Sequence, residues 1–142
     1  FTDDSVFKKL KAQKVTLQQL LKKADYLSLH APYTKKTKEI IQKKTLSLMK
    51  KDAVIINVAR GELINETDLY NSLKKRNIRA ASLDVLTEEP PKKTNKLLTL
   101  DNCIITPHSA WYSTNAQNEL RQKAAEEVRR VLLRRKPKNQ IN

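Results

Sequence analysis

The chain has 142 residues, of which 39% are hydrophobic and 5% aromatic, so it is long enough to form one domain with a hydrophobic core. No stretch approaches the roughly 20 consecutive apolar residues of a membrane-spanning helix. The single cysteine, Cys103, lies in an apolar run and is expected to be a buried thiol. Without a second cysteine no intramolecular disulfide forms, which favours a reducing compartment, so we expect a cytoplasmic protein that does not bind membranes.

The basic residues are distributed along the whole chain. With 29 lysine and arginine residues against 15 aspartate and glutamate residues, the formal net charge is +14. Most lysine pairs fall where a helix would face water, which favours a solvated surface over a nucleic-acid footprint. The tight basic clusters are Arg129-Arg130 and Arg134-Arg135-Lys136. On charge alone, nucleic acid is therefore a possible but less favoured partner.

The first half of the chain predicts helices that alternate with strands. Thr16 and Gln19 have the spacing of a capping box, and the leucines that follow lie at helical intervals, so a helix is expected there. Residues 26–29 form a short apolar run that ends before a proline, and they predict a strand. A short helix is expected over 45–50, followed by a strand over 53–58.

The second half continues this alternation. A capping pattern over 65–68 predicts the start of a helix. Strands are expected over 78–85 and 103–106, with a loop rich in Pro, Lys and Thr over 86–101 between them. Residues 114–135 have apolar residues at intervals of three to four positions and predict one long amphipathic helix.

This pattern predicts an α/β domain with a parallel sheet of about four strands and flanking helices. The apolar runs are short and continuous, so we expect strands that are buried on both faces. In an open parallel sheet, ligands bind beyond the carboxyl ends of the strands, where the loops converge. Arg60, Glu89 and His108 each follow one of these runs. They supply an anion clamp, an orienting carboxylate and a proton donor, a combination that suggests chemistry on a small carboxylic acid.

Each candidate residue also has a purely structural interpretation. Arg60 stands in a turn where it can pair with a surface acid, and His108 stands at a strand end where a backbone carbonyl can satisfy it. Asp84 can cap a neighbouring loop, and a lone tryptophan such as Trp111 is commonly a core residue. His30 has no second histidine or cysteine at ligand spacing, so no metal site is expected.

Several segments resemble motifs of the D-isomer-specific 2-hydroxyacid dehydrogenases, which interconvert 2-keto and 2-hydroxy acids with a nicotinamide cofactor. The segment 55–66 (IINVARGELINE) is similar to the arginine motif of that family. The segments 83–90 (LDVLTEEP) and 106–108 (TPH) are similar to its acidic and histidine motifs, and 26–37 is similar to its upstream cofactor loop. The segment 109–113 (SAWYS) resembles the branch that holds phosphoglycerate dehydrogenase-like enzymes and C-terminal-binding-protein corepressors. Together these motifs cover most of the chain.

The resemblance implies a role for each candidate residue. Arg60 would hold the substrate carboxylate, His108 would act as acid and base, and Glu89, with Glu88 as its rival, would orient the imidazole and stabilise its charged form. Trp111 would form a wall of the substrate pocket. The implied cofactor is NAD, with NADP left open, and Asp84 would meet its nicotinamide amide. The residues that would lie along the cofactor are Ala31, Pro32, Thr37, Val58, Ala59, Arg60, Asp84 and His108.

The resemblance also shows what this chain lacks. The cofactor domain of the family begins with a strand, a Gly-rich turn and a helix, and the glycines let the backbone approach the pyrophosphate. This chain has one glycine, Gly61, and therefore no G-x-G-x-x-G motif. We expect residues 1–113 to be the second half of a Rossmann-like NAD-binding domain. Residues 114–142 would be the C-terminal helix and tail that return to a mostly absent substrate domain, and Phe1 would begin partway through a longer protein.

These expectations lead to one preferred function and two alternatives. The preferred function is hydride transfer between a nicotinamide cofactor and a small D-2-hydroxy acid or 2-keto acid, by an oxidoreductase of which this chain is a fragment that is inactive alone. The resemblance further implies a homodimer. An NAD(H)-sensing, corepressor-like scaffold would keep the same residues, and a basic nucleic-acid-binding fragment would use the net charge of +14.

Overall fold

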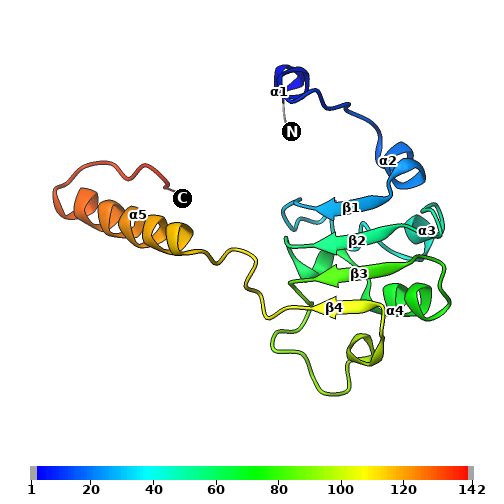
Figure 1. Cartoon of the computed structure of the whole chain (residues 1–142). Coiled ribbons are helices and arrows are strands. Elements are labelled where there is room, and N and C mark those ends of the chain that lie inside the picture. Colours follow the sequence, from blue (N-terminus) through cyan, green and yellow to red (C-terminus); the bar gives the residue numbers. More distant parts are fainter. Residues whose placement is uncertain (1–2, 141–142) are drawn as a thin grey trace. The chain divides into compact units, whose positions relative to one another are not determined.

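The computed structural model describes residues 3–140 of the chain and divides them into two compact units. The first unit extends to His108 and the second begins at Ser109, and each is described by itself. With η denoting a 3-10 helix, the elements of the first unit are α1 (Asp4–Lys9), α2 (Leu17–Lys23), β1 (Tyr26–Leu29), α3 (Lys43–Leu46), β2 (Val54–Asn57), η1 (Gly61–Leu63), α4 (Glu66–Lys74), β3 (Ala80–Leu83), η2 (Lys96–Thr99) and β4 (Cys103–Ile105) (Figure 1). The second unit contains α5 (Thr114–Leu132).

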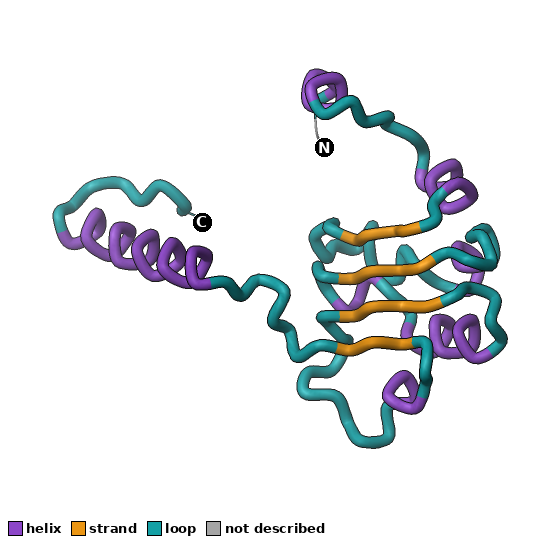
Figure 2. The backbone as a smooth tube through the Cα atoms, viewed as in Figure 1, coloured by secondary structure: helices purple, strands orange, loops and turns teal. Residues whose placement is uncertain are grey.

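The strands of the first unit form one parallel, four-stranded sheet in the order β1-β2-β3-β4 (Figure 2). The register aligns Ser28, Ile56, Ser82 and Ile104 in one row across the sheet. Parallel neighbours need crossover connections, and here the crossovers contain α3, α4 and η2. The predicted α/β class with about four parallel strands and flanking helices is confirmed.

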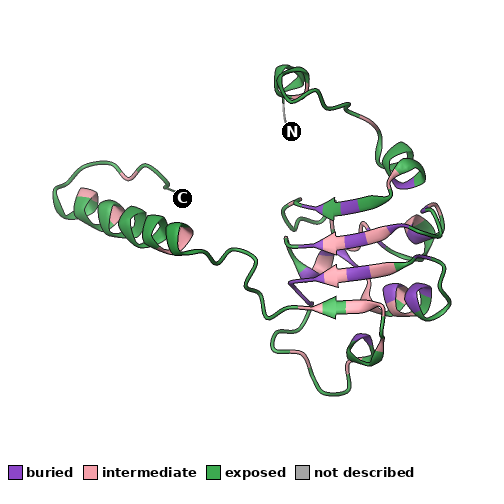
Figure 3. Cartoon of the chain, viewed as in Figure 1, coloured by how far each residue is buried: buried purple, intermediate pink, exposed green. Residues whose placement is uncertain are grey.

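The hydrophobic core lies against one face of the sheet. Burial alternates along β1, β2 and β3, so that every second residue of each strand is buried (Figure 3). The inward residues Leu27, Ile55 and Ala81 belong to the same buried cluster as Leu21 of α2 and Leu69 of α4. Full burial of a leucine or isoleucine side chain contributes roughly 1.5–3 kcal/mol. The core therefore fixes the strands, and with them the loops at their carboxyl ends.

The expectation that the strands are buried on both faces is wrong for residues 3–108. On the face opposite the core, Tyr26 of β1 is 67% exposed and Ile104 of β4 is 65% exposed. The helices α2, α3 and α4 place their buried apolar residues in the one cluster with the inward strand residues. A continuous apolar run specifies side chains that are suited to burial, but which face of the sheet a helix covers depends on the tertiary arrangement.

The capping signals of the sequence are confirmed by hydrogen bonds. At α2, Thr16 Oγ1 accepts from the Gln19 N–H at 3.2 Å, and Gln19 Oε1 accepts from the Thr16 N–H at 3.0 Å. At α4, the Asn65 side chain accepts from the Asp68 N–H at 3.0 Å. Each bond satisfies a backbone donor that has no partner inside the helix, which is why these helices begin where they do.

Other boundaries differ from the expected ones for local reasons. α3 begins earlier than the helix expected over 45–50, because Thr45 Oγ1 accepts from the Gln42 N–H at 2.7 Å and caps the first turn. The loop expected over 86–101 contains η2, whose first turn is capped by the Asn95 side chain accepting from the Leu97 N–H at 3.0 Å. α1 lies in a segment for which no helix was predicted.

The second unit is built around α5. Its N-cap is Ser113, whose Oγ accepts from the Ala116 N–H at 3.0 Å. No residue of this helix is buried. Among its apolar side chains, those of Leu120 and Val128 are each 60% exposed. The residues after α5 turn back along it, so that the Lys138 N–H donates to Glu127 Oε2 at 3.0 Å. None of the helices in residues 3–140 combines the length and the apolar character that crossing a membrane requires.

Candidate functional site

The candidate site lies at the carboxyl ends of β2, β3 and β4. Asp84 directly follows β3, while Arg60 and His108 come shortly after β2 and β4. Because parallel strands run in the same direction, these residues are delivered to the same edge of the sheet. Glu89 comes from the loop between β3 and β4.

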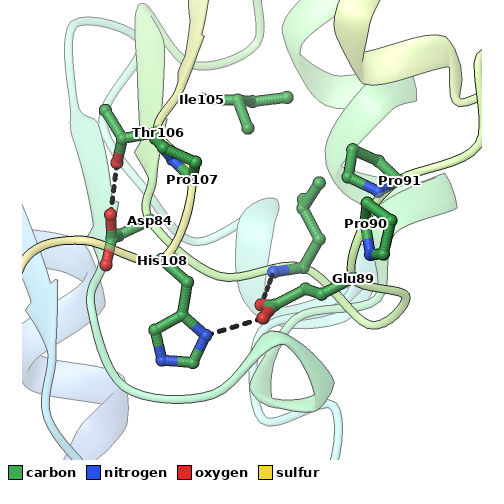
Figure 4. Close-up of a pocket in the computed structure, with 9 residues that line it drawn as sticks. Asp84, Glu89, Pro90, Pro91, Ile105, Thr106, Pro107 and His108 are labelled. Atoms are coloured by element: carbon green, nitrogen blue, oxygen red, sulfur yellow. Dashed lines mark hydrogen bonds and ion pairs between the residues drawn. The ribbon is translucent and has the colours of Figure 1, made fainter.

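His108 and Glu89 form a directly bonded pair in this site. His108 Nδ1 lies 2.6 Å from Glu89 Oε2, and the other oxygen, Oε1, accepts from the Leu86 N–H at 2.8 Å (Figure 4). Burial raises the pKa of the Glu89 carboxyl, but the hydrogen bonds from His108 and from the Leu86 amide outweigh it, and the pKa is held below its usual value of 4.5. Glu89 is therefore a carboxylate at neutral pH and orients the imidazole through Nδ1. Its rival Glu88 instead pairs with Lys92 at 3.1 Å.

The backbone at His108 has a left-handed conformation. Its φ is 53°, a value that a non-glycine residue adopts only at a cost of about 1 kcal/mol or more. The His108 N–H donates to the Asp84 carbonyl oxygen at 3.0 Å and to the Thr106 carbonyl oxygen at 3.0 Å. These bonds attach the turn that carries His108 to the end of β3. The imidazole is thereby directed toward Glu89.

Asp84 is the buried carboxyl group of the site. It is 6% exposed, and Thr106 Oγ1 donates to its Oδ1 at 2.5 Å. The Asp84 N–H donates to the Asn57 carbonyl oxygen at 2.9 Å, which connects the ends of β2 and β3. Asp84 is thus held by groups from both neighbouring strands.

Arg60, Glu89 and His108 line one small pocket. Its volume is about 190 Å³, and its walls are formed by Arg60, Gly61, Glu62, Val85, Leu86, Thr87, Glu89 and His108. An arginine, an imidazole and a carboxylate around a cavity of this size suit a small anion with a neighbouring oxygen. The structure therefore brings together the residues that the sequence assigned to catalysis.

A second, larger pocket also has His108 and Glu89 in its wall (Figure 4). It has a volume of about 350 Å³ and is lined by Asp84, Leu86, Glu89, Pro90, Pro91, Ile105, Thr106, Pro107 and His108. Its wall is mostly apolar, since prolines and aliphatic residues predominate. His108 and Glu89 are accordingly shared by two cavities of different character.

Asn57 organises the turn that carries Arg60, and the sequence analysis did not single it out. Its side chain is 0% exposed; Nδ2 donates to the Arg60 carbonyl oxygen at 2.9 Å, and Oδ1 accepts from the Ala59 N–H at 3.1 Å. A polar residue that ends an otherwise apolar strand was the available signal, because buried amides need partners.

Gly61 has a steric role in the same turn. A Cβ atom added at this position would overlap the backbone of Leu86 and Thr87. The absence of a side chain therefore allows the turn after β2 to pack directly against the loop that carries Glu89. This close approach brings the Arg60 turn and the Glu89 loop together.

The residues expected along the upstream part of the cofactor lie elsewhere on this sheet edge. Ala31, Pro32 and Thr37 follow β1, and Thr37 Oγ1 donates to the Pro32 carbonyl oxygen at 2.7 Å. They line neither of the two pockets described above, and neither do Val58 and Ala59. These positions supply backbone groups and small side chains rather than charged contacts.

Trp111 belongs to the second unit. Its side chain is 52% exposed and packs edge-to-face against Tyr112, with ring centroids 5.6 Å apart and an interplanar angle of 81°. Trp111 is thus not a core residue of this unit. Among residues 3–140, no group of three or more histidine, cysteine, aspartate or glutamate side chains has a metal-binding arrangement.

Comparison with known proteins identifies relatives of this fold and site. Residues 2–110 match the profile of the family described as D-isomer specific 2-hydroxyacid dehydrogenase, NAD binding domain. The chain is 48% identical over 126 residues to a D-3-phosphoglycerate dehydrogenase of Methanocaldococcus jannaschii, a match that covers 89% of this chain and 24% of that protein.

Solved structures give the same result. An acyclic imino acid reductase in complex with NADPH and D-Arg superposes with a TM-score of 0.84 at 44% identity, covering 92% of this chain and 41% of that one. A D-lactate dehydrogenase from Aquifex aeolicus, complexed with NAD and lactic acid, superposes with a TM-score of 0.84 at 30% identity, covering 92% of this chain and 44% of that one. The chain therefore spans between a quarter and a half of the length of these relatives. The relatives are dehydrogenases and reductases, which favours neither the scaffold nor the nucleic-acid alternative.

Proposed function

Because the chain belongs to the D-isomer specific 2-hydroxyacid dehydrogenase family through its NAD binding domain, we propose that its protein transfers a hydride between a nicotinamide cofactor and a small D-2-hydroxy acid or 2-keto acid. One observation carries this proposal: the His108–Glu89 hydrogen bond of 2.6 Å is on the wall of the same small pocket as Arg60. The substrate class follows from what these groups bind, namely a carboxylate next to a carbonyl or hydroxyl oxygen.

In this proposal Arg60 binds the substrate. Its guanidinium has paired donors that match a carboxylate and an adjacent oxygen. The turn that presents it is fixed by the Asn57 side chain and by the contact of Gly61 with the Leu86–Thr87 backbone. The backbone that carries Arg60 is therefore fixed before the substrate binds, while the guanidinium itself donates from Nη1 to the Ala59 carbonyl oxygen at 2.6 Å.

His108 moves the proton. In the direction of reduction it donates a proton from Nε2 to the carbonyl oxygen, and in the reverse direction it removes that proton from the hydroxyl group. Glu89 accepts from Nδ1–H, which selects the tautomer and stabilises the imidazolium. The lowered pKa of Glu89 keeps it ionised throughout this cycle.

The residues of this chain fit the nicotinamide end of NAD, which supplies or accepts the hydride when bound. Asp84 is a buried acceptor held by Thr106, and in this proposal it accepts from the amide of nicotinamide. Backbone groups at the ends of β1 and β2 complete the contact, from Ala31, Pro32, Thr37, Val58, Ala59 and Arg60. A Gly-rich cradle for the pyrophosphate does not occur in this sequence, whose one glycine lies against Leu86.

We propose three further properties on the same basis. Trp111 walls the substrate pocket, the protein is a homodimer, and it resides in the cytoplasm. The cytoplasmic location is supported by the single cysteine, because a chain that forms no intramolecular disulfide does not require an oxidising compartment. Sedimentation of the full-length protein tests the dimer, and a fluorescence change of Trp111 on addition of a 2-keto acid tests the pocket wall.

The decisive experiment is turnover by variants of the full-length enzyme. His108→Ala is expected to lower kcat on the order of 100- to 10,000-fold. Arg60→Ala is expected to raise KM for the keto acid as well as to lower kcat. Lys51→Ala, at an exposed position before β2, is the matched control and should retain normal turnover. Near-normal turnover by either site variant would refute the proposal.

A binding measurement on this chain complements turnover. Titration of the chain with NADH, followed by the fluorescence of the dihydronicotinamide, should show weak, saturable binding at the nicotinamide end of the site. Asp84→Ala should abolish that binding. Binding that is indifferent to Asp84→Ala would contradict the assigned cofactor position.

A further inference from the structure

Glu66 connects the first turn of α4 to both ends of the loop that carries Glu89. Its Oε1 accepts from the Thr87 N–H at 2.6 Å, and its Oε2 accepts from Asn95 Nδ2 at 3.0 Å. These partners lie 21 and 29 positions away in the sequence. A glutamate in the first turn of a helix ordinarily serves the N-terminal amides of that helix. Here both carboxylate oxygens are bonded to the loop instead.

The two amides at the start of this loop bind two different carboxylates. The Leu86 N–H donates to Glu89 Oε1 at 2.8 Å, and the next amide, that of Thr87, donates to Glu66 Oε1 at 2.6 Å. Gly61 packs against the peptide between Leu86 and Thr87. The segment that anchors the Glu89 carboxylate is therefore held by Glu66 on one side and by the Arg60 turn on the other.

Asn95 defines the other end of the loop. Its N–H donates to the Lys92 carbonyl oxygen at 2.9 Å, and its Oδ1 caps η2 by accepting from the Leu97 N–H at 3.0 Å. Its Nδ2 is the group that Glu66 binds. One carboxylate thus spans the loop from Thr87 to Asn95 and limits where Glu89 can lie.

We propose that Glu66 is a positioning residue that holds Glu89, and through Glu89 the His108 ring, in the geometry of the candidate site. The effect of Glu66 on catalysis rests on the proposed function. Its effect on the positions of Glu89 and His108 does not. Glu66 itself lines neither of the two pockets that contain His108, so it acts through the loop and not on the substrate.

A carboxylate suits this role better than its neutral isostere. Hydrogen bonds that a charged acceptor receives are roughly twice as strong as neutral ones. Glutamine would retain one acceptor oxygen for the Thr87 amide, but its NH₂ group would face the donor of Asn95. Glu66→Gln therefore removes one of the two bonds, whereas Glu66→Ala removes both.

The test is the NMR signal of the His108 Nδ1–H proton in this chain. The chain has two histidines, and His30, whose Nε2 is 2.8 Å from Ser28 Oγ, is the internal control. Glu89→Gln shows where the signal lies without the carboxylate. Glu88→Gln, which affects only the Lys92 ion pair in the same loop, is the matched control and should leave the signal at its wild-type position.

We expect the His108 proton to exchange with solvent at least about tenfold faster in Glu66→Ala, with an intermediate rate in Glu66→Gln. Asn95→Asp keeps the cap on Leu97 but replaces the donor to Glu66 with a second carboxylate, so the exchange should be at least as fast as in Glu66→Gln. If Glu66→Ala does not fold, Glu66→Gln and Asn95→Asp decide the matter. A wild-type signal and exchange rate in these variants, even with a lower unfolding temperature, would overturn the proposal.

Kinetics of the full-length enzyme give the second readout. Glu66→Ala should lower kcat on the order of 10- to 100-fold because the acid–base group is misplaced, while KM for NADH changes less than about twofold. A rise in KM for NADH with unchanged kcat would overturn the proposal. Full activity of His108→Ala would instead refute the proposed function, while the NMR result would still report on Glu66.

Discussion

The buried side chain of Asn57 holds the Arg60 carbonyl oxygen at 2.9 Å and the Ala59 amide at 3.1 Å. Through these two bonds an asparagine at the end of β2 closes the turn that presents the guanidinium. The Asn57 carbonyl also accepts from the Asp84 N–H at 2.9 Å, so the same residue connects the ends of β2 and β3. The backbone of Arg60, the residue proposed to bind the substrate carboxylate, is thus held by a residue that contacts no substrate in the proposed mechanism.

Replacement of Asn57 should therefore destabilise the fold. Asn57→Ala leaves the Ala59 N–H and the Arg60 carbonyl without their partner, and we expect a loss of about 1–3 kcal/mol in the free energy of unfolding. Urea denaturation of the chain measures it. Asn71→Ala, at an exposed position of α4, is the control and should change the value by less than about 0.5 kcal/mol. Equal effects of the two substitutions would contradict this account.

Gly61 should tolerate no side chain. In Gly61→Ala the new methyl group overlaps the backbone of Leu86 and Thr87, which cannot move aside as a flexible side chain would. We expect a loss of about 1–3 kcal/mol in the free energy of unfolding, together with a weakened His108–Glu89 bond. Thermal unfolding measures the first effect and the His108 Nδ1–H exchange rate measures the second. An unchanged unfolding temperature would show that the two segments are not in contact.

Glu89 should make stability depend on pH in the acidic range. Its pKa is lowered in the folded state, because the bonds from His108 and Leu86 outweigh the effect of burial. The unfolded chain therefore binds a proton at Glu89 at a higher pH than the folded chain does. The contribution of the Glu89 carboxylate to the free energy of unfolding is complete above about pH 4.5 and is lost as the pH falls through the lowered pKa. Urea denaturation at pH 6 and pH 3 should show a smaller loss of stability for Glu89→Gln than for the wild type; parallel losses would refute the assignment.

Cys103 should be an unreactive thiol in the folded chain. The side chain is half-buried rather than buried as expected, and this partial burial, with a contribution from the nearby charge of Glu66, raises its pKa from 9.0 to about 11. The thiolate fraction at pH 8 is therefore on the order of 100-fold lower than in the unfolded chain, and alkylation is slower in proportion. Mass spectrometry after iodoacetamide treatment, with and without urea, gives the two rates. Equal rates would mean that the side chain is neither buried nor influenced by Glu66.

Local patterns in the sequence correctly predicted the sheet, most of the helices and the residues that follow the strands. The apolar runs produced the strands, and the cap residues Thr16 and Asn65 marked helix starts, because these signals involve contacts between near neighbours. The direction of parallel strands then required that Arg60, Asp84 and His108 emerge at one edge. The motifs around these residues were sufficient to identify the family, and comparison of the sequence confirms that identification.

Tertiary structure decided how those residues are held. The bond between His108 and Glu89 spans 19 positions and that between Glu66 and Asn95 spans 29, and no local pattern specifies either. The residue with the left-handed backbone, His108, has its amide bonded to the carbonyl of Asp84, which lies 24 positions earlier at the end of another strand. Likewise, the apolar strands proved to be covered on one face in residues 3–108, since burial depends on which helices pack where. Sequence determines what each segment can form alone, whereas the hydrogen bonds between segments exist only once the core has brought the strands and loops together.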